Sequence, residues 1–192
     1  MSTPPSMRDW LESELYQRRT IQLAGVLADE VGGRLAATLM TMDAEGDDAV
    51  EFRMTSQGGS IDAAFSLIDT IDLLGVPVRA VALGRVAGPA AFVFALCPVR
   101  FAAPSASLQL LEPNFAHTGR PDELVRASVS DQKRLDDLIE RLVGVSGRAR
   151  SEITADIRSG RVFTASEARQ AGLVDEIAVA PNAGHRGNPS AV

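Results

Sequence analysis

Apolar and polar residues alternate along the chain in two different periods. Apolar residues at helical spacing predict helices at 9–17, 29–42, 61–71, 121–143 and 148–157. Shorter apolar runs predict strands at 20–23, 49–54, 78–83, 99–102 and 108–111. Strand 78–83 is apolar apart from Arg79, which is typical of a strand covered on both faces. Strands and helices in this order predict one domain of the α/β class.

Two glycine-containing turns each connect a strand to a helix. Gly58 and Gly59 follow strand 49–54, and the segment GRVAGP at 84–89 separates strand 78–83 from a helix of small residues. Glycine allows a tight turn that leaves backbone N–H groups bare at a helix start. Such helix starts attract anions and polarised carbonyl groups. The two turns are therefore candidates for a functional site.

Composition narrows the function classes. The formal net charge is −6 and the pI about 5.0, so nucleic acid is not an expected partner. Residues 1–10 lack the apolar core of a signal peptide, and no apolar run is long enough for a membrane span. The single cysteine, Cys97, excludes an intrachain disulfide and is expected to be a small buried residue in a reducing compartment. We therefore expect a cytoplasmic protein without a membrane partner.

The ends and one internal loop are expected to carry no site. Residues 1–8 contain two prolines and are expected to be mobile, residues 9–178 to form the domain, and residues 179–192 to be a disordered tail. The acidic loop 43–48 lacks the residue order of a calcium loop, so we interpret it as a solvated turn. No metal and no cofactor are predicted.

Three motifs resemble the proteolytic subunit of the Clp protease, ClpP. They are SQGGSI at 56–61 with GRVAGPAAF at 84–92, LQLLEPN at 108–114, and RVFTASEARQAGLVDEI at 161–177. The third is similar to the family pattern D-R-[FY]-[LM]-[ST]-A-x-E-A-x-x-[YF]-G-[LI]-[IV]-D, and the resemblance covers about residues 9–177. It implies the repeated β-β-α superhelical fold that ClpP shares with crotonases, with a protruding strand–helix handle that packs two rings face to face.

The resemblance also implies that the catalytic triad is lost. Gly88 stands at the nucleophilic serine, Leu111 at the histidine, and Arg161 at the aspartate. The family's oxyanion hole uses two backbone N–H groups, here those of Gly59 and of position 89, and Pro89 has no N–H. Acyl transfer by this route needs nucleophile, base and orienting carboxylate. The expected protein is thus an inactive subunit, similar to ClpR.

The partners implied by the resemblance are other ring subunits. We expect a homo-oligomeric ring, heptameric or tetradecameric, or mixed rings with active ClpP subunits. Contact with a Clp ATPase is also implied, although few residues precede helix 9–17. Backbone groups can still pair an extended peptide as an added strand. The segments implied to form this peptide groove are Gly59, Ser60 and Ile61 on one side, and Glu112 to Asn114 on the other.

Several alternatives stay open at this point. The chain could be a crotonase-like acyl-thioester enzyme or a stand-alone homo-oligomeric protein that binds peptides. His117 could fold back toward the groove, although the sequence identifies neither an orienting carboxylate nor a serine for it. Arg161 could extend into solvent or pair with a carboxylate, and the candidates are Glu112, Asp156 and Glu167.

Overall fold

The computed structural model describes residues 6–115 and 117–178. Its helices are α1 (Met7–Gln17), α2 (Asp29–Glu45), α3 (Ile61–Leu73), α4 (Pro89–Leu96), α5 (Pro121–Ser146), α6 (Arg150–Ser159) and α7 (Ala165–Gln170). Its strands are β1 (Thr20–Ala24), β2 (Val50–Ser56), β3 (Val78–Ala87), β4 (Val99–Ala102), β5 (Ser107–Gln109), β6 (Val162–Thr164) and β7 (Glu176–Ile177).

Most residues of the predicted N-terminal segment and of the predicted C-terminal tail are not among the described residues. The tail 179–192 and residues 1–5 of the N-terminal segment are not among the described residues. Helix α1 begins at Met7, two residues before the predicted start. Ser6 caps it, because its hydroxyl accepts a hydrogen bond from the N–H of Asp9 and the Asp9 carboxylate accepts one from the N–H of Ser6.

The strands form one sheet that is mostly parallel. Strands β1, β2, β3, β4 and β7 lie side by side in that order, and each neighbouring pair is parallel. Strand β3 pairs with β4 along its first half, then with β5 at Arg85–Ala87, and β6 pairs antiparallel with β5. The predicted α/β fold class is confirmed.

Strand β3 differs from its prediction in two ways. It continues to Ala87, past the predicted end at residue 83, because β5 supplies a second partner for residues 85–87. Its side chains alternate between buried and exposed, so the prediction that both faces are covered is wrong. Arg79 and Val81 lie on the less buried face, in register with Glu51 and Arg53 of β2. The long side chain of Arg79 packs over the ring of Phe101, 4.9 Å from its centroid.

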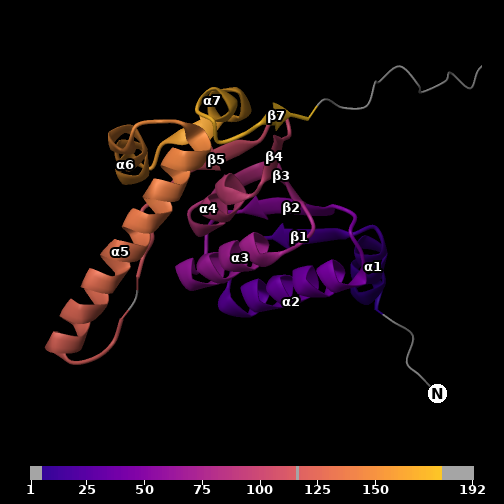
Figure 1. Cartoon of the computed structure of the whole chain (residues 1–192), viewed down its shortest axis with the longest axis horizontal. Coiled ribbons are helices and arrows are strands. Elements are labelled where there is room, and N and C mark those ends of the chain that lie inside the picture. Colours follow the sequence, from indigo (N-terminus) through magenta and orange to yellow (C-terminus); the bar gives the residue numbers. More distant parts are fainter. Residues whose placement is uncertain (1–5, 116, 179–192) are drawn as a thin grey trace, which may run out of the picture.

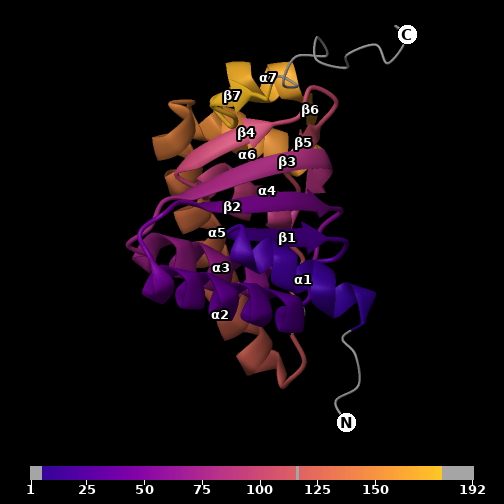
Figure 2. The ribbon, with the colours of Figure 1, turned by 90° about the vertical axis from the view of Figure 1, so that its right-hand side faces the viewer.

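Helices cover the opposite face of the sheet. Figure 2 looks onto the strands, with α4, α5 and α6 behind them and α2 and α3 beyond the β1 edge. The core contains Leu23, Phe52, Met54, Leu67, Phe92 and Phe94, all fully buried. Helices α2 and α3 approach closely at Gly32, where an added Cβ would lie 2.7 Å from the Cβ of Ala63. A residue larger than glycine would push the two helices apart.

Helix α5 projects from the body of the molecule (Figure 1). Its C-terminal half is anchored in the core through Leu135, Leu138, Ile139 and Leu142. Its N-terminal half presents Leu124, Val125 and Val129 as exposed apolar side chains. This helix corresponds to the handle that the sequence predicts. None of the helices in residues 6–115 and 117–178 combines the length and the hydropathy that a membrane span requires.

Arg100 connects the sheet to the C-terminal segment. This residue is 7% exposed, and its guanidinium donates to both carboxylate oxygens of Asp175 and to the carbonyls of Ala95 and Gly172. The backbone N–H of Arg100 also donates to Asp175, at 2.8 Å. Partial burial raises the pKa of Asp175, but these hydrogen bonds outweigh it and hold the pKa below its usual value. The pair fixes β7 beside β4.

We expect Asp175→Asn to lower the free energy of unfolding at pH 7 by about 3 kcal/mol, the lower end for a broken buried ion pair. The lower end applies because the Asp175 side chain is 42% exposed. A depressed pKa stabilises the fold above the unfolded-state value of 3.8, and this stabilisation is lost as the pH falls through the folded-state pKa. The difference between wild type and variant should therefore shrink below pH 3.8 in urea titrations. Asp47→Asn, in an exposed loop, is the control and should change stability little.

Candidate functional site

The two glycine-containing turns meet at the end of β3. The hydroxyl of Ser56 donates to the carbonyl of Gly58 and accepts from its N–H, which holds the first turn closed. The N–H of Gly88, in the second turn, donates to the carbonyl of Gln109 at 2.9 Å. A Cβ on Gly88 would lie 3.4 Å from the Cα of Gly58. The two turns therefore lie next to each other in the structure.

Gly88 has a backbone conformation that side chains disfavour. Its φ is 56° and its ψ is −136°, at the N-cap of α4. L-residues rarely adopt positive φ, and a non-glycine residue held there stores about 1–3 kcal/mol of strain. Space is not the obstacle, since the contacts of an added Cβ are ordinary van der Waals distances. Glycine removes the strain and also removes any nucleophile at this position.

Leu111 lies between Gly88 and a second glycine, Gly160. A Cβ on Gly88 would be 3.9 Å from Leu111 Cδ1, and a Cβ on Gly160 would be 3.0 Å from Leu111 Cδ2. The side-chain amide of Gln109 donates to the carbonyl of Gly160 at 2.7 Å and ties this loop to β5. The point of convergence thus contains a leucine side chain flanked by two glycines. No side chain at these three positions has a group that can donate or accept a hydrogen bond or carry a proton.

Arg161 contacts Asp156 and Phe163. Its Nη1 lies 3.4 Å from Asp156 Oδ1, its guanidinium packs over the ring of Phe163 at 4.5 Å, and its side chain is 46% exposed. The predicted pairing with Asp156, one of three candidates, is confirmed. Asp156 is itself buried and also contacts Arg148.

The geometry favours Gly160 over Arg161 as the third position of the site. Counted back from Thr164-Ala165-Ser166-Glu167-Ala168, the family pattern puts its arginine on Arg161 and its aspartate on Gly160. The same residue is the one whose Cβ would touch Leu111. Gly160, one residue before Arg161, is therefore the better candidate for the aspartate position on geometry.

The two predicted oxyanion-hole positions differ in what they offer. Gly59 faces Leu27, whose N–H donates to the carbonyl of Gly58 and whose carbonyl accepts from the N–H of Ser60. In such a parallel pairing the N–H of Gly59 itself points away from Leu27. A Cβ on Gly59 would lie 2.2 Å from the carbonyl oxygen of Leu27, so only glycine fits. Pro89 begins α4 and has no N–H to contribute.

The predicted peptide groove consists of residues from two segments, 59–61 and 112–114. Ser60 caps α3 by accepting from the N–H of Ala63, and Ile61 is buried. In the second segment Glu112 and Asn114 are both exposed. In the described part of the chain, the backbone of residues 112–114 forms no hydrogen bond with another segment.

His117 has a carboxylate partner that the sequence did not identify. Its Nε2 lies 2.5 Å from Oδ2 of Asp131, a buried residue of α5. The two residues meet only because the loop before α5 folds back along the helix, and no sequence spacing indicates that. Among the described residues, His117 has no hydrogen bond to a serine. The other histidine, His185, lies outside the described residues.

Other reactive groups are poorly placed for chemistry. Burial raises the pKa of the Cys97 thiol to about 12, so the thiol is protonated and not nucleophilic. Within the described ranges, no three His, Cys, Asp or Glu side chains are arranged to hold a metal ion.

Comparison with known families identifies one match. Residues 6–181 match the family described as Clp protease. The match covers most of the chain and includes both glycine-containing turns, Leu111 and Gly160.

We expect Gly88→Ala to lower the free energy of unfolding by about 1–3 kcal/mol, because alanine must adopt the strained conformation of Gly88. The control is Gly33→Ala in the middle of α2, where a Cβ meets nothing within 4 Å. This control should raise stability by about 0.5–1 kcal/mol. Urea unfolding of the three proteins gives both values. A neutral Gly88→Ala would contradict a positive φ at this position.

Proposed function

The chain belongs to the Clp protease family, and we propose that it is a catalytically inactive, ClpR-like subunit with a structural or regulatory role in a ring-shaped Clp peptidase assembly. The observation that carries this proposal is the leucine side chain between two glycines, at the point where the turns converge. The fold around that point is kept, while each group that would do chemistry there is replaced.

Magnitudes support the absence of hydrolysis. A serine peptidase without its triad retains about 10³- to 10⁴-fold acceleration over water, from its oxyanion hole and binding contacts. Loss of one oxyanion-hole donor removes about 10²- to 10³-fold of that. Pro89 is such a loss. Little acceleration is left, and peptide cleavage falls below detection.

The proposed partners follow from the family. Members of the Clp protease family form ring oligomers, and we propose homo-heptameric or tetradecameric rings, or mixed rings with active ClpP subunits, in the cytoplasm. The exposed apolar residues Leu124, Val125 and Val129 on the projecting half of α5 support a contact between rings at this helix. A Clp ATPase is a further proposed partner. The unpaired backbone at 112–114 supports retention of peptide binding.

The acyl-thioester alternative gains no support from the site. Chemistry of that kind stabilises an enolate oxygen with two backbone N–H donors, and Pro89 supplies none. A stand-alone homo-oligomer would differ from the proposed Clp subunit only in its partners. An experiment on binding partners therefore distinguishes the two functions.

We expect neither the wild type nor Gly88→Ser to hydrolyse a fluorogenic peptide above a no-enzyme control, because a serine alone lacks a base, an orienting carboxylate and one N–H donor. The set Gly88→Ser, Pro89→Ala, Leu111→His and Gly160→Asp restores all four groups and should give measurable hydrolysis. A matched set with Arg161→Asp in place of Gly160→Asp should be at least about 100-fold slower, because its carboxylate does not orient the histidine. Turnover by Gly88→Ser alone would refute the proposed inactivity.

We expect native mass spectrometry to show ring-sized oligomers, alone or after mixing with an active ClpP subunit. In a mixed ring the mass increments identify how many copies of each chain are present. The double variant Val125→Glu/Val129→Glu keeps the full chain and places two charges on the exposed half of α5. It should leave single rings intact and abolish double rings. A protein that stays monomeric under every mixing condition would refute the ring role.

A further inference from the structure

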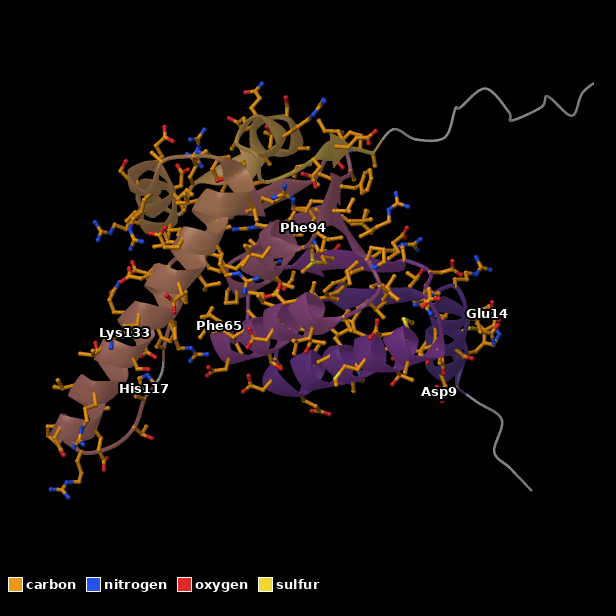
Figure 3. The ribbon with its side chains drawn as sticks, in the orientation of Figure 1. Asp9, Glu14, Phe65, Phe94, His117 and Lys133 are labelled. Carbon is orange, nitrogen blue, oxygen red and sulfur yellow. The ribbon has the colours of Figure 1, made fainter. Side chains whose placement is uncertain are left out.

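A cavity of about 260 Å³ lies between the loop before α5 and the helix itself. The walls include Glu112 and Phe115 from the loop, and Asp131, Gln132 and Leu135 from α5, with His117 at one side. Figure 3 shows His117 beside α5, with Lys133 further along the same helix. Liquid water occupies about 30 Å³ per molecule, so the cavity has room for roughly eight waters. This volume is larger than an arginine side chain needs.

The cavity carries two carboxylates and one basic side chain, His117, which contacts Asp131. Glu112 and Asp131 bring two carboxylates, and none of the described residues around this cavity is an arginine or a lysine. Asp131 is only 8% exposed, and His117 contacts just one of its two carboxylate oxygens. Glu112 forms no ion pair with any described residue. A mostly buried carboxylate favours a positively charged partner strongly, because few waters solvate it.

The basic residues nearby belong to a neighbouring cavity. Arg150 and Arg158 of α6 lie there, on the other side of Glu112, Gln132 and Leu135. Arg150 is already paired with Asp136 and Glu140. Lys133 follows Gln132 on α5 but is exposed and does not line the cavity. Apart from His117, no basic side chain lining either cavity contacts the carboxylate of Asp131.

The cavity opens where the proposed peptide groove runs. Glu112 and Pro113 belong both to the groove segment and to the cavity wall, so a residue of a bound strand next to them can insert its side chain. Phe115 and Leu135 suit the methylene stem and the flat face of a guanidinium, while two carboxylates suit its forked donors. The ammonium group of a lysine has the right charge but lacks the two parallel N–H donors of a guanidinium.

We infer that this cavity binds an arginine side chain of an extended peptide held in the groove, so that the subunit selects peptides with arginine at one position. This inference rests on the peptide binding included in the proposed function and names its ligand class. Asp131 and Glu112 accept from the guanidinium. His117 holds Asp131 in place through the opposite oxygen.

The test uses the intact protein and a series of short fluorescein-labelled alanine peptides that differ only in the central residue. That residue is arginine, lysine, citrulline or norleucine, where citrulline has the shape of arginine without its charge. Hydrogen bonds between charged groups are worth about tenfold or more in affinity. Fluorescence polarisation should show the arginine peptide binding at least about tenfold tighter than the citrulline peptide.

Asp131→Asn and Glu112→Gln should each remove most of this preference and leave the citrulline affinity within about twofold, because only the charge changes. Asp137→Asn is the matched control, an exposed aspartate on the same helix outside the cavity wall, and should keep the full preference. Circular dichroism melts confirm that each variant is folded. Since Asp131 is buried, Glu112→Gln keeps the test valid where Asp131→Asn unfolds.

The outcomes separate the two proposals. Equal binding of arginine and citrulline peptides refutes the arginine cavity and leaves the groove standing, as does a preference that survives both substitutions. A lysine peptide that binds as tightly as arginine refutes the forked recognition. Failure of every peptide to bind refutes the cavity and the groove together, whereas the ring role is decided separately by native mass.

Discussion

The site depends on the change of partner along β3. Its first half pairs with β4 and its second half with β5, so the end of β3 lies beside Gln109 rather than at a free edge. That pairing brings Gly88 next to Leu111, and the side chain of Gln109 then holds the loop at Gly160 in place. Three segments far apart in the sequence meet because one strand serves two neighbours. The catalytic framework of a Clp protease is therefore a consequence of sheet pairing, independent of the side chains that occupy it.

Much of the fold could be predicted because its causes are local. Apolar spacing identified the long helices and most strands, and the glycine-containing turns indicated where strands would end near one another. The second half of β3 was missed because its partner, β5, lies twenty residues away in sequence and only pairing makes residues 85–87 extended. The open face of β3 was also missed, since Val81 and Leu83 are apolar whether or not a helix covers them.

The site was predicted less completely, for reasons that are also physical. Gly88, Leu111 and Pro89 could be assigned because they sit inside recognisable motifs. Assigning the third position required knowledge of where the side chains of a loop point. Gly160 lies against Leu111, whereas the next residue, Arg161, contacts Asp156. The pair of His117 and Asp131 depends on how a loop folds against α5, and neither residue lies in a pattern that anticipates the other.

In the proposed inactive subunit, Gly88 opposes a return to catalysis by single substitutions. A side chain at this position brings backbone strain, and it brings catalysis only when a base, a carboxylate and a second N–H donor are already present. An added Cβ at Gly160 meets Leu111 Cδ2 at 3.0 Å, so an aspartate there requires the leucine side chain to shift. In the proposed subunit a single substitution therefore brings strain or displacement without catalysis, which leaves the groove free to change toward holding a peptide rather than cutting it.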